Sequence, residues 1–100
     1  MSIARWMPGE GPRDKLLERG AVALSDAELL AVLLHTGYRD CSALDVARTL
    51  LKEFDGIGGL MRAGQGCLLA CPGIGPAKYA RLRAAMELAC RQALETVSMG

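Results

Sequence analysis

Two prolines that bracket a Gly-Ile-Gly turn constrain the fold of this chain more than any other feature. Pro72 disfavours helical geometry in the residue before it, and Pro76 stands where a following helix would begin. Between them, Gly73 and Gly75 allow positive φ and the close approach of another backbone. Residues 77 to about 94 contain neither glycine nor proline and are rich in alanine, arginine and leucine. We therefore predict a short helix, a tight hairpin and a long second helix.

The start of that second helix has the features of an anion-binding turn. The first N–H groups of a helix have no acceptor within it, and they lie at the positive end of its dipole. Lys78 adds a cation in the first turn, where its charge opposes the dipole unless an anion lies nearby. We therefore predict a phosphate-binding site. Its residues are Gly73, Ile74, Gly75, Ala77, Lys78 and Arg81.

The same segment resembles the second half of a helix-hairpin-helix motif, with Leu82 in the helix that follows the hairpin. In proteins with this motif the hairpin amides contact the DNA backbone without reading bases, and a monovalent cation under the hairpin carbonyls is permitted. Tyr79 departs from the pattern, which usually has alanine there. The alternative interpretation is a helical hairpin that serves only packing or protein contact.

The rest of the chain is also predicted to be helical. Apolar residues make up 51% of the sequence but aromatic residues only 4%, so the core must consist of leucine, alanine, valine and methionine. No run of alternating β-branched residues indicates a strand. Pro12 begins a helix that Gly20 ends, and Ser25 with Glu28 forms a capping box before an apolar helix that we place in the middle of the domain.

Two helical hairpins follow from this pattern. Residues 25–54, in which Ser42 caps the second helix, are predicted to form helix, loop, helix, and residues 65–94 are predicted to form helix, hairpin, helix. Such units usually pack about a pseudo-twofold axis, and the first lacks the Gly-x-Gly turn. The glycine-rich connection 55–66 is expected to be flexible but compact, with a short turn around Leu60 and Met61.

These elements predict one all-α domain of about five short helices, a tandem helix-hairpin-helix bundle of the RuvA domain 2-like or SAM-like kind with a degenerate first hairpin. The domain is expected to cover residues 12–95. An extended arm with Trp6 as a surface anchor precedes it over 1–11, and a frayed tail follows over 96–100.

Cysteine and histidine usage argues against a metal centre or a catalytic site. The four cysteines, Cys41, Cys67, Cys71 and Cys90, form no CxxC pair, so we interpret them as buried or half-buried free thiols in a reducing compartment. His35 is the sole histidine, and we assign it a structural or surface role. The chain has neither a transmembrane segment nor a secretory signal, so we expect a cytoplasmic protein without membrane association.

The charge of the chain predicts weak binding. The net charge is only +1, and in the last helix Lys78, Arg81, Arg83 and Arg91 outnumber Glu87. Arg81 and Arg83 would supply long-range attraction to DNA, although a solvated helix face explains the same arginines. We expect salt-sensitive binding that needs another domain or a second copy.

Four stretches resemble the N-terminal domain of the RadC (UPF0758) family, historically labelled DNA repair proteins. They are Gly11–Leu17, Gly20–Ala31, Leu34–Gly37 and Pro72–Lys78, and the likeness extends from about Ile3 to Arg91. The resemblance implies a DNA-binding region that a separate metalloprotease-like domain follows, with a His-x-His and Asp zinc site. Because this sequence has one histidine, we expect no such centre and therefore no enzyme activity here. We interpret the chain as a domain excised from a longer protein or a natural fragment.

An alternative function is a protein-interaction or regulatory module that positions that C-terminal domain. Its expected sign is an exposed apolar patch formed by Trp6, Leu60 and Met61, with dimerisation insensitive to salt. The oligomeric state is left open.

Overall fold

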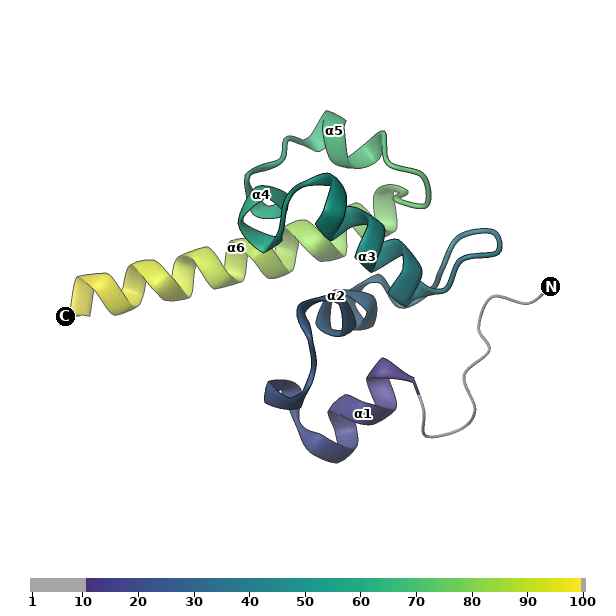
Figure 1. Ribbon diagram of the computed structural model, residues 1–100. Helices are drawn as coiled ribbons and strands as arrows, with labels where there is room; N and C mark the ends of the chain where they lie inside the picture. Colours follow the sequence, from purple (N-terminus) through teal and green to yellow (C-terminus); the bar gives the residue numbers. More distant parts are fainter. Residues whose placement is uncertain (1–10, 100) are drawn as a thin grey trace.

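Six α-helices and one short 3₁₀ turn make up the computed structural model, which describes residues 11–99 and the side chains of residues 11–97. The all-α prediction is confirmed, because the described part of the chain contains no strand and only an isolated bridge between Tyr38 and Cys41. The helices are α1 (Pro12–Arg19), α2 (Asp26–Leu34), α3 (Ala43–Glu53), α4 (Ile57–Arg62), α5 (Gln65–Leu69) and α6 (Pro76–Met99), and the 3₁₀ turn spans Ala21–Ala23 (Figure 1). Residues 1–10 of the predicted arm, which include Trp6, lie outside the described residues.

Side-chain caps set where α2 and α3 begin. Ser25 Oγ accepts a hydrogen bond from the Glu28 amide at 3.2 Å, and the Glu28 carboxylate accepts one from the Ser25 amide at 2.8 Å. Ser42 and Asp45 form the same reciprocal pair at 3.1 Å in both directions. Both capping boxes satisfy amides that would otherwise be unpaired at a helix start, and the predicted box at Ser25 is confirmed.

One leucine from each of four helices forms the centre of the core. Leu34 of α2, Leu50 of α3, Leu68 of α5 and Leu82 of α6 are almost completely removed from solvent. Helix α2 packs against α1, α3 and α6, which confirms its predicted place in the middle of the domain (Figure 1). These contacts join the α2–α3 hairpin to the α5–α6 hairpin. The leucines of one hairpin are buried only when the other hairpin packs against them.

The connection between the two hairpins is more ordered than predicted. Residues Ile57–Arg62 form α4, and Leu60 is 2% exposed, so the predicted short turn and the exposed patch at Leu60 are wrong. Arg83 explains part of this order, because its guanidinium donates to the carbonyl oxygens of Met61 at 3.3 Å and Ala63 at 2.7 Å. These bonds satisfy carbonyls at the end of α4, where a helix lacks internal donors.

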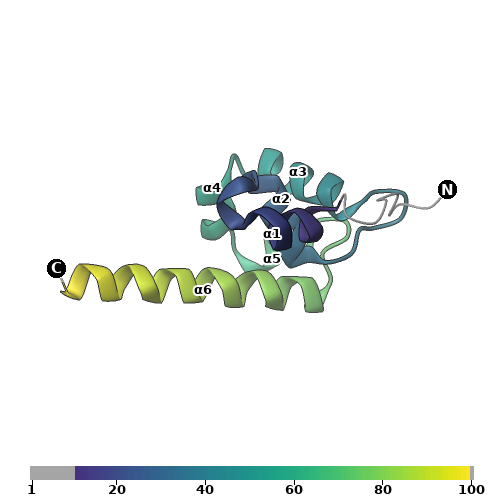
Figure 2. The ribbon, with the colours of Figure 1, turned by 90° about the horizontal axis from the view of Figure 1, so that it is seen from below.

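The last helix is also longer than predicted. Residues 96–99 continue α6, so the predicted frayed tail is wrong for them. No glycine or proline interrupts the segment before Gly100, and Thr96 Oγ1 donates to the Gln92 carbonyl at 3.0 Å while it accepts from Gln92 Nε2 at 2.8 Å. The C-terminal half of α6 extends well beyond the other helices (Figure 2).

Helix α1 lies at the edge of the domain, where a charged contact joins it to α2. None of its residues is buried, but Lys15 Nζ donates to both carboxylate oxygens of Glu28 at 3.1 Å. The pKa of Glu28 is lowered, first by the hydrogen bond from the Ser25 backbone and then by Lys15. Glu28 therefore links the cap of α2 to the position of α1.

Replacing Leu82 with alanine is expected to destabilise the domain strongly. The change removes a fully buried side chain and leaves a cavity among four helices, at a cost of about 2–5 kcal/mol in the free energy of unfolding. Leu88→Ala on the same helix is the matched control, because Leu88 is 69% exposed and its truncation should cost less than about 0.5 kcal/mol. Urea denaturation followed by circular dichroism measures both, and equal losses would contradict this core.

The link through Glu28 predicts a pH-dependent contribution to stability. A carboxylate whose pKa is lower in the folded state stabilises the fold above its unfolded pKa, and this stabilisation is lost as pH falls through the folded pKa. Glu28→Gln should therefore melt below the parent at neutral pH, and the difference in Tm should shrink as the solution is acidified below about pH 4. Glu18→Gln on the exposed part of α1 is the control, and a pH-independent difference for Glu28→Gln would refute the link.

Candidate anion-binding site

The turn between α5 and α6 uses its two glycines differently. Gly73 has φ of +89°, a conformation that disfavours other residues, whereas Gly75 does not have a positive φ. A Cβ on Gly73 would lie 2.7 Å from the Cβ of Tyr38, but nothing lies within 4 Å of a Cβ on Gly75. The fold therefore requires a glycine at position 73. Gly75 faces open space, so no other group covers the turn at this position.

Some amides of the turn are engaged and others are open. The Ile74 amide donates to the Cys71 carbonyl at 3.1 Å, and the Ile74 side chain is 4% exposed, so this residue anchors the turn. Within the described residues, the amides of Gly73, Gly75, Ala77 and Lys78 donate no hydrogen bond. Gly75 and Ala77 are exposed to solvent. The turn thus presents main-chain donors at the positive end of a helix of 24 residues.

The basic side chains predicted to support this turn divide into two groups. Lys78 is half-buried and its ammonium donates to the Gly37 carbonyl at 3.4 Å, so it lies between the turn and the loop that joins α2 to α3. Arg81 is exposed and forms no ion pair within residues 11–97. Arg83 forms the second group, because its guanidinium is engaged within the fold by the carbonyl oxygens of Met61 and Ala63 at the end of α4.

The α2–α3 loop is part of this surface, although its residues were not predicted as site residues. Tyr38 and Cys41 exchange backbone hydrogen bonds at 3.0 and 2.9 Å, which folds the loop back on itself. Arg39 has φ of +54°, and its guanidinium lies 5.2 Å from the centre of the Tyr38 ring. The contact between Tyr38 and Gly73 brings the exposed Arg39 into the neighbourhood of the hairpin.

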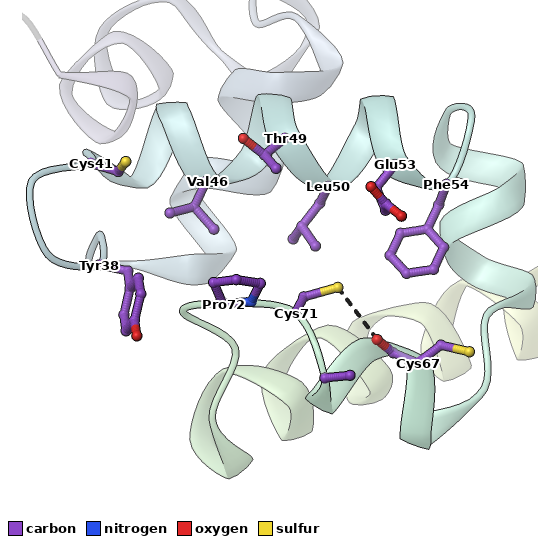
Figure 3. Close-up of a pocket in the computed structure, with 11 residues that line it drawn as sticks. Tyr38, Cys41, Val46, Thr49, Leu50, Glu53, Phe54, Cys67, Cys71 and Pro72 are labelled. Atoms are coloured by element: carbon purple, nitrogen blue, oxygen red, sulfur yellow. Dashed lines mark hydrogen bonds between the residues drawn. The ribbon is translucent and has the colours of Figure 1, made fainter.

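A cavity of about 560 Å³ lies between α3 and α5, behind the hairpin (Figure 3). Its wall is mostly apolar, with Val46, Leu50 and Phe54 from α3 and Pro72 from the turn.

The four cysteines are free thiols, but the prediction that they are buried or half-buried is correct only for Cys71, because Cys41, Cys67 and Cys90 are exposed. The Cys71 thiol donates to the Cys67 carbonyl at 3.4 Å. Burial raises the pKa of the Cys71 thiol, and Glu53 and Cys67 raise it further. Cys71 therefore stays a protonated thiol, which is a poor nucleophile and a poor metal ligand.

Metal coordination and membrane insertion find no support in the described part of the chain. Between residues 11 and 97, no three histidine, cysteine, aspartate or glutamate side chains converge in a way that could hold a metal ion. None of the helices within residues 11–99 combines the length and the apolar character needed to cross a bilayer.

Comparison with known proteins identifies relatives of this chain. A family model described as UPF0758 N-terminal matches residues 3–80. UPF0758 proteins of Shewanella sp. (strain W3-18-1), Shewanella putrefaciens and Shewanella baltica are each 53% identical to it over 100 residues. The match covers 100% of this chain and 44% of each relative, so the chain spans less than half the length of these curated relatives. No solved structure shows significant similarity to it.

The different roles of the two glycines give a matched prediction for stability. Gly73→Ser should cost more than about 1–2 kcal/mol, because it forces a side chain into the left-handed region and against Tyr38. Gly75→Ser should change the free energy of unfolding by less than about 0.5 kcal/mol, since its side chain enters open space at a position where serine caps helices well. Thermal denaturation checks both variants. A Gly75→Ser variant as unstable as Gly73→Ser would show that the space beside Gly75 is not open.

Proposed function

Because the chain belongs to the UPF0758 family through its N-terminal domain, we propose that it is a sequence-nonspecific DNA-binding module. The proposed site is the hairpin between α5 and α6, and its ligand is the phosphodiester backbone. The observation that carries the proposal is the set of unengaged amides at Gly73, Gly75, Ala77 and Lys78. The resemblance to RadC proteins supports a role in DNA repair as the N-terminal part of a longer protein, with no chemical step performed by this chain.

Main-chain donors explain why the binding would be independent of sequence. Amide groups and a lysine ammonium hydrogen-bond phosphate oxygens, which are the same at every base pair, whereas sequence is read at base edges. An incoming phosphate would also resolve the unfavourable position of Lys78 near the positive end of the α6 dipole. Arg81 and Arg39 are exposed near the hairpin and would attract the backbone at longer range.

The charge of the molecule limits the strength of this binding. The net charge is +1, and only a few cations of residues 11–97 lie near the hairpin, so we expect the release of few counterions from DNA. We therefore expect weak affinity that falls steeply with salt. A second hairpin, supplied by another domain or another copy, would raise the affinity through the effective concentration of linked sites.

A second candidate function is a protein-interaction module that positions the C-terminal region of a full-length UPF0758 protein. An apolar groove between α2, α4 and α6 favours it, since Leu33 and Ile57 at this groove are 38% and 42% exposed. The relatives are more than twice as long as this chain, so they contain a region that could dock there. Apolar docking would be insensitive to salt, in contrast to phosphate binding.

The DNA-binding proposal predicts a specific pattern of chemical shifts. In a titration with a short duplex at low salt, the amides of Gly73, Gly75, Ala77 and Lys78 should shift, because a phosphate adds the acceptor they lack. The Ile74 amide should shift less, since it already donates to Cys71. Absence of shifts at the four open amides with millimolar duplex DNA would reject the proposal.

Two variants separate the hairpin from general electrostatics. Lys78→Glu should weaken binding at least about tenfold and lower the slope of log affinity against log salt by about 1. Lys52→Glu makes the same change of net charge at an exposed position at the end of α3, and it should bind almost like the parent. Gly75→Ser should also weaken binding, because an N-cap hydroxyl accepts from the amides that the phosphate needs. Equal binding by the two lysine variants in fluorescence anisotropy would contradict the site.

A further inference from the structure

We propose that Tyr38 stacks against an unpaired base of the bound DNA, so that the chain prefers duplexes that carry unpaired nucleotides over fully paired ones. The stacking rests on the proposed function, because a phosphate of the same strand must lie on the α5–α6 hairpin. Tyr38 is 37% exposed in the α2–α3 loop, and no other aromatic side chain of residues 11–97 is as exposed. Aromatic rings of this kind are the surfaces on which proteins hold bases that have no pairing partner.

The ring of Tyr38 lies directly beside the proposed phosphate site. A Cβ on Gly73 would lie 2.7 Å from the Cβ and 3.0 Å from the Cγ of Tyr38, so the ring packs against one of the four residues whose amides are open. Lys78 adds a second link between loop and turn, since its ammonium donates to the Gly37 carbonyl at 3.4 Å. A phosphate on the hairpin therefore brings the neighbouring nucleotide to the ring.

The backbone of the loop fixes the position of this ring before DNA arrives. Tyr38 and Cys41 form a bridge, and a Cβ on Gly37 would collide with the Cys41 carbonyl oxygen, so the two sides of the loop are in close contact. Two residues of the loop other than glycine have positive φ, His35 at +73° and Arg39 at +54°. Such conformations are costly, persist only where the surrounding structure imposes them, and gather at binding sites. The ring is thus preorganised, which lowers the entropy lost on binding.

Space for a base lies next to the ring. Tyr38 and Pro72 both line the cavity of about 560 Å³ between α3 and α5, and Figure 3 shows both on the side of it where the loop meets the turn. The mostly apolar wall offers a surface to the face of a base and few groups that read its edges, so we expect little preference among the four bases. A paired base does not reach this space, because it is stacked inside the double helix.

Arg39 supplies the charge that a stacked nucleotide needs. Its guanidinium lies 5.2 Å from the centre of the Tyr38 ring, and this cation–π contact steadies the ring. Arg39 is exposed and forms no ion pair with a carboxylate of residues 11–97, so its remaining donors can bind the phosphate of the stacked nucleotide. An uncharged apolar ligand would use the cavity but neither this cation nor the open amides, whereas a nucleotide uses all three.

Fluorescence anisotropy with matched DNA ligands tests the preference. One ligand is a fully paired duplex, and the other is a forked duplex with the same number of phosphates and a run of unpaired thymines on both strands at one end. The parent should bind the fork roughly 5- to 150-fold more tightly, the gain expected from one stacked base. A fork with abasic sites at the unpaired positions keeps the phosphates but lacks the bases, so it should bind like the paired duplex.

Two variants assign the preference to the ring. Tyr38→Ala should lose the preference for the fork and keep the affinity of the parent for the paired duplex. Tyr38→Phe should keep both, because it keeps the ring. In the complex of the parent with the fork, nuclear Overhauser contacts should join the Tyr38 ring protons to thymine protons. Circular dichroism checks that both variants are folded.

The contrary outcomes separate the stacking from the proposed function. Equal binding of fork and duplex by the parent would overturn the stacking and leave the hairpin as a phosphate site. Equal binding of the thymine fork and the abasic fork would assign the preference to single-stranded phosphates and also overturn the stacking. A folded Tyr38→Ala variant that loses affinity for both ligands equally would show that the ring only supports the hairpin. A parent that binds neither ligand would reject DNA binding and the stacking together.

Discussion

The packing of Leu34, Leu50, Leu68 and Leu82 against one another fixes almost everything else in this domain. These side chains come from α2, α3, α5 and α6, so the core forms only when the two helical hairpins meet. Their meeting brings the α2–α3 loop against the α5–α6 turn, where Tyr38 contacts Gly73. The position of the open amides is thus a consequence of apolar packing beneath them, and the candidate site rests on the buried core of the fold.

The two hairpins differ in how their turns use backbone hydrogen-bond donors. In the α2–α3 loop, Tyr38 and Cys41 use their amides and carbonyls on each other, and the following helix begins with a side-chain cap from Ser42. In the α5–α6 turn, Pro76 and the absence of a capping side chain leave the donors at the start of α6 without acceptors. Serine caps satisfy a helix start from within, whereas a glycine in the same place leaves that role to a ligand. This difference explains why the second turn, and not the first, is the candidate phosphate site.

Local chemistry predicted much of this structure, and long-range contacts account for the differences. Pro12 and Gly20 gave the limits of α1, and Ser25 with Glu28 gave the start of α2, because caps depend on neighbours in sequence.

Helix α4 was not predicted because its sequence, Ile-Gly-Gly-Leu-Met-Arg, has poor helix propensity. Its end is stabilised by hydrogen bonds from Arg83, which is distant in the sequence. The roles of Tyr38 and Arg39 also depend on a contact between hairpins that no local pattern encodes. The amides open to a ligand were predictable from Gly75 and Pro76, but the engagement of Ile74 depends on the detailed turn geometry.

The most direct measurement is the scalar coupling across hydrogen bonds between amide nitrogens and DNA phosphorus in a complex of labelled protein with duplex DNA. Such a coupling arises only when an amide donates to a phosphate oxygen. The account predicts couplings at Gly75 and Ala77, with none at Ile74. Saturable DNA binding without any coupling in residues 73–78 would show that DNA contacts another surface and would contradict the assignment of the hairpin as the phosphate site.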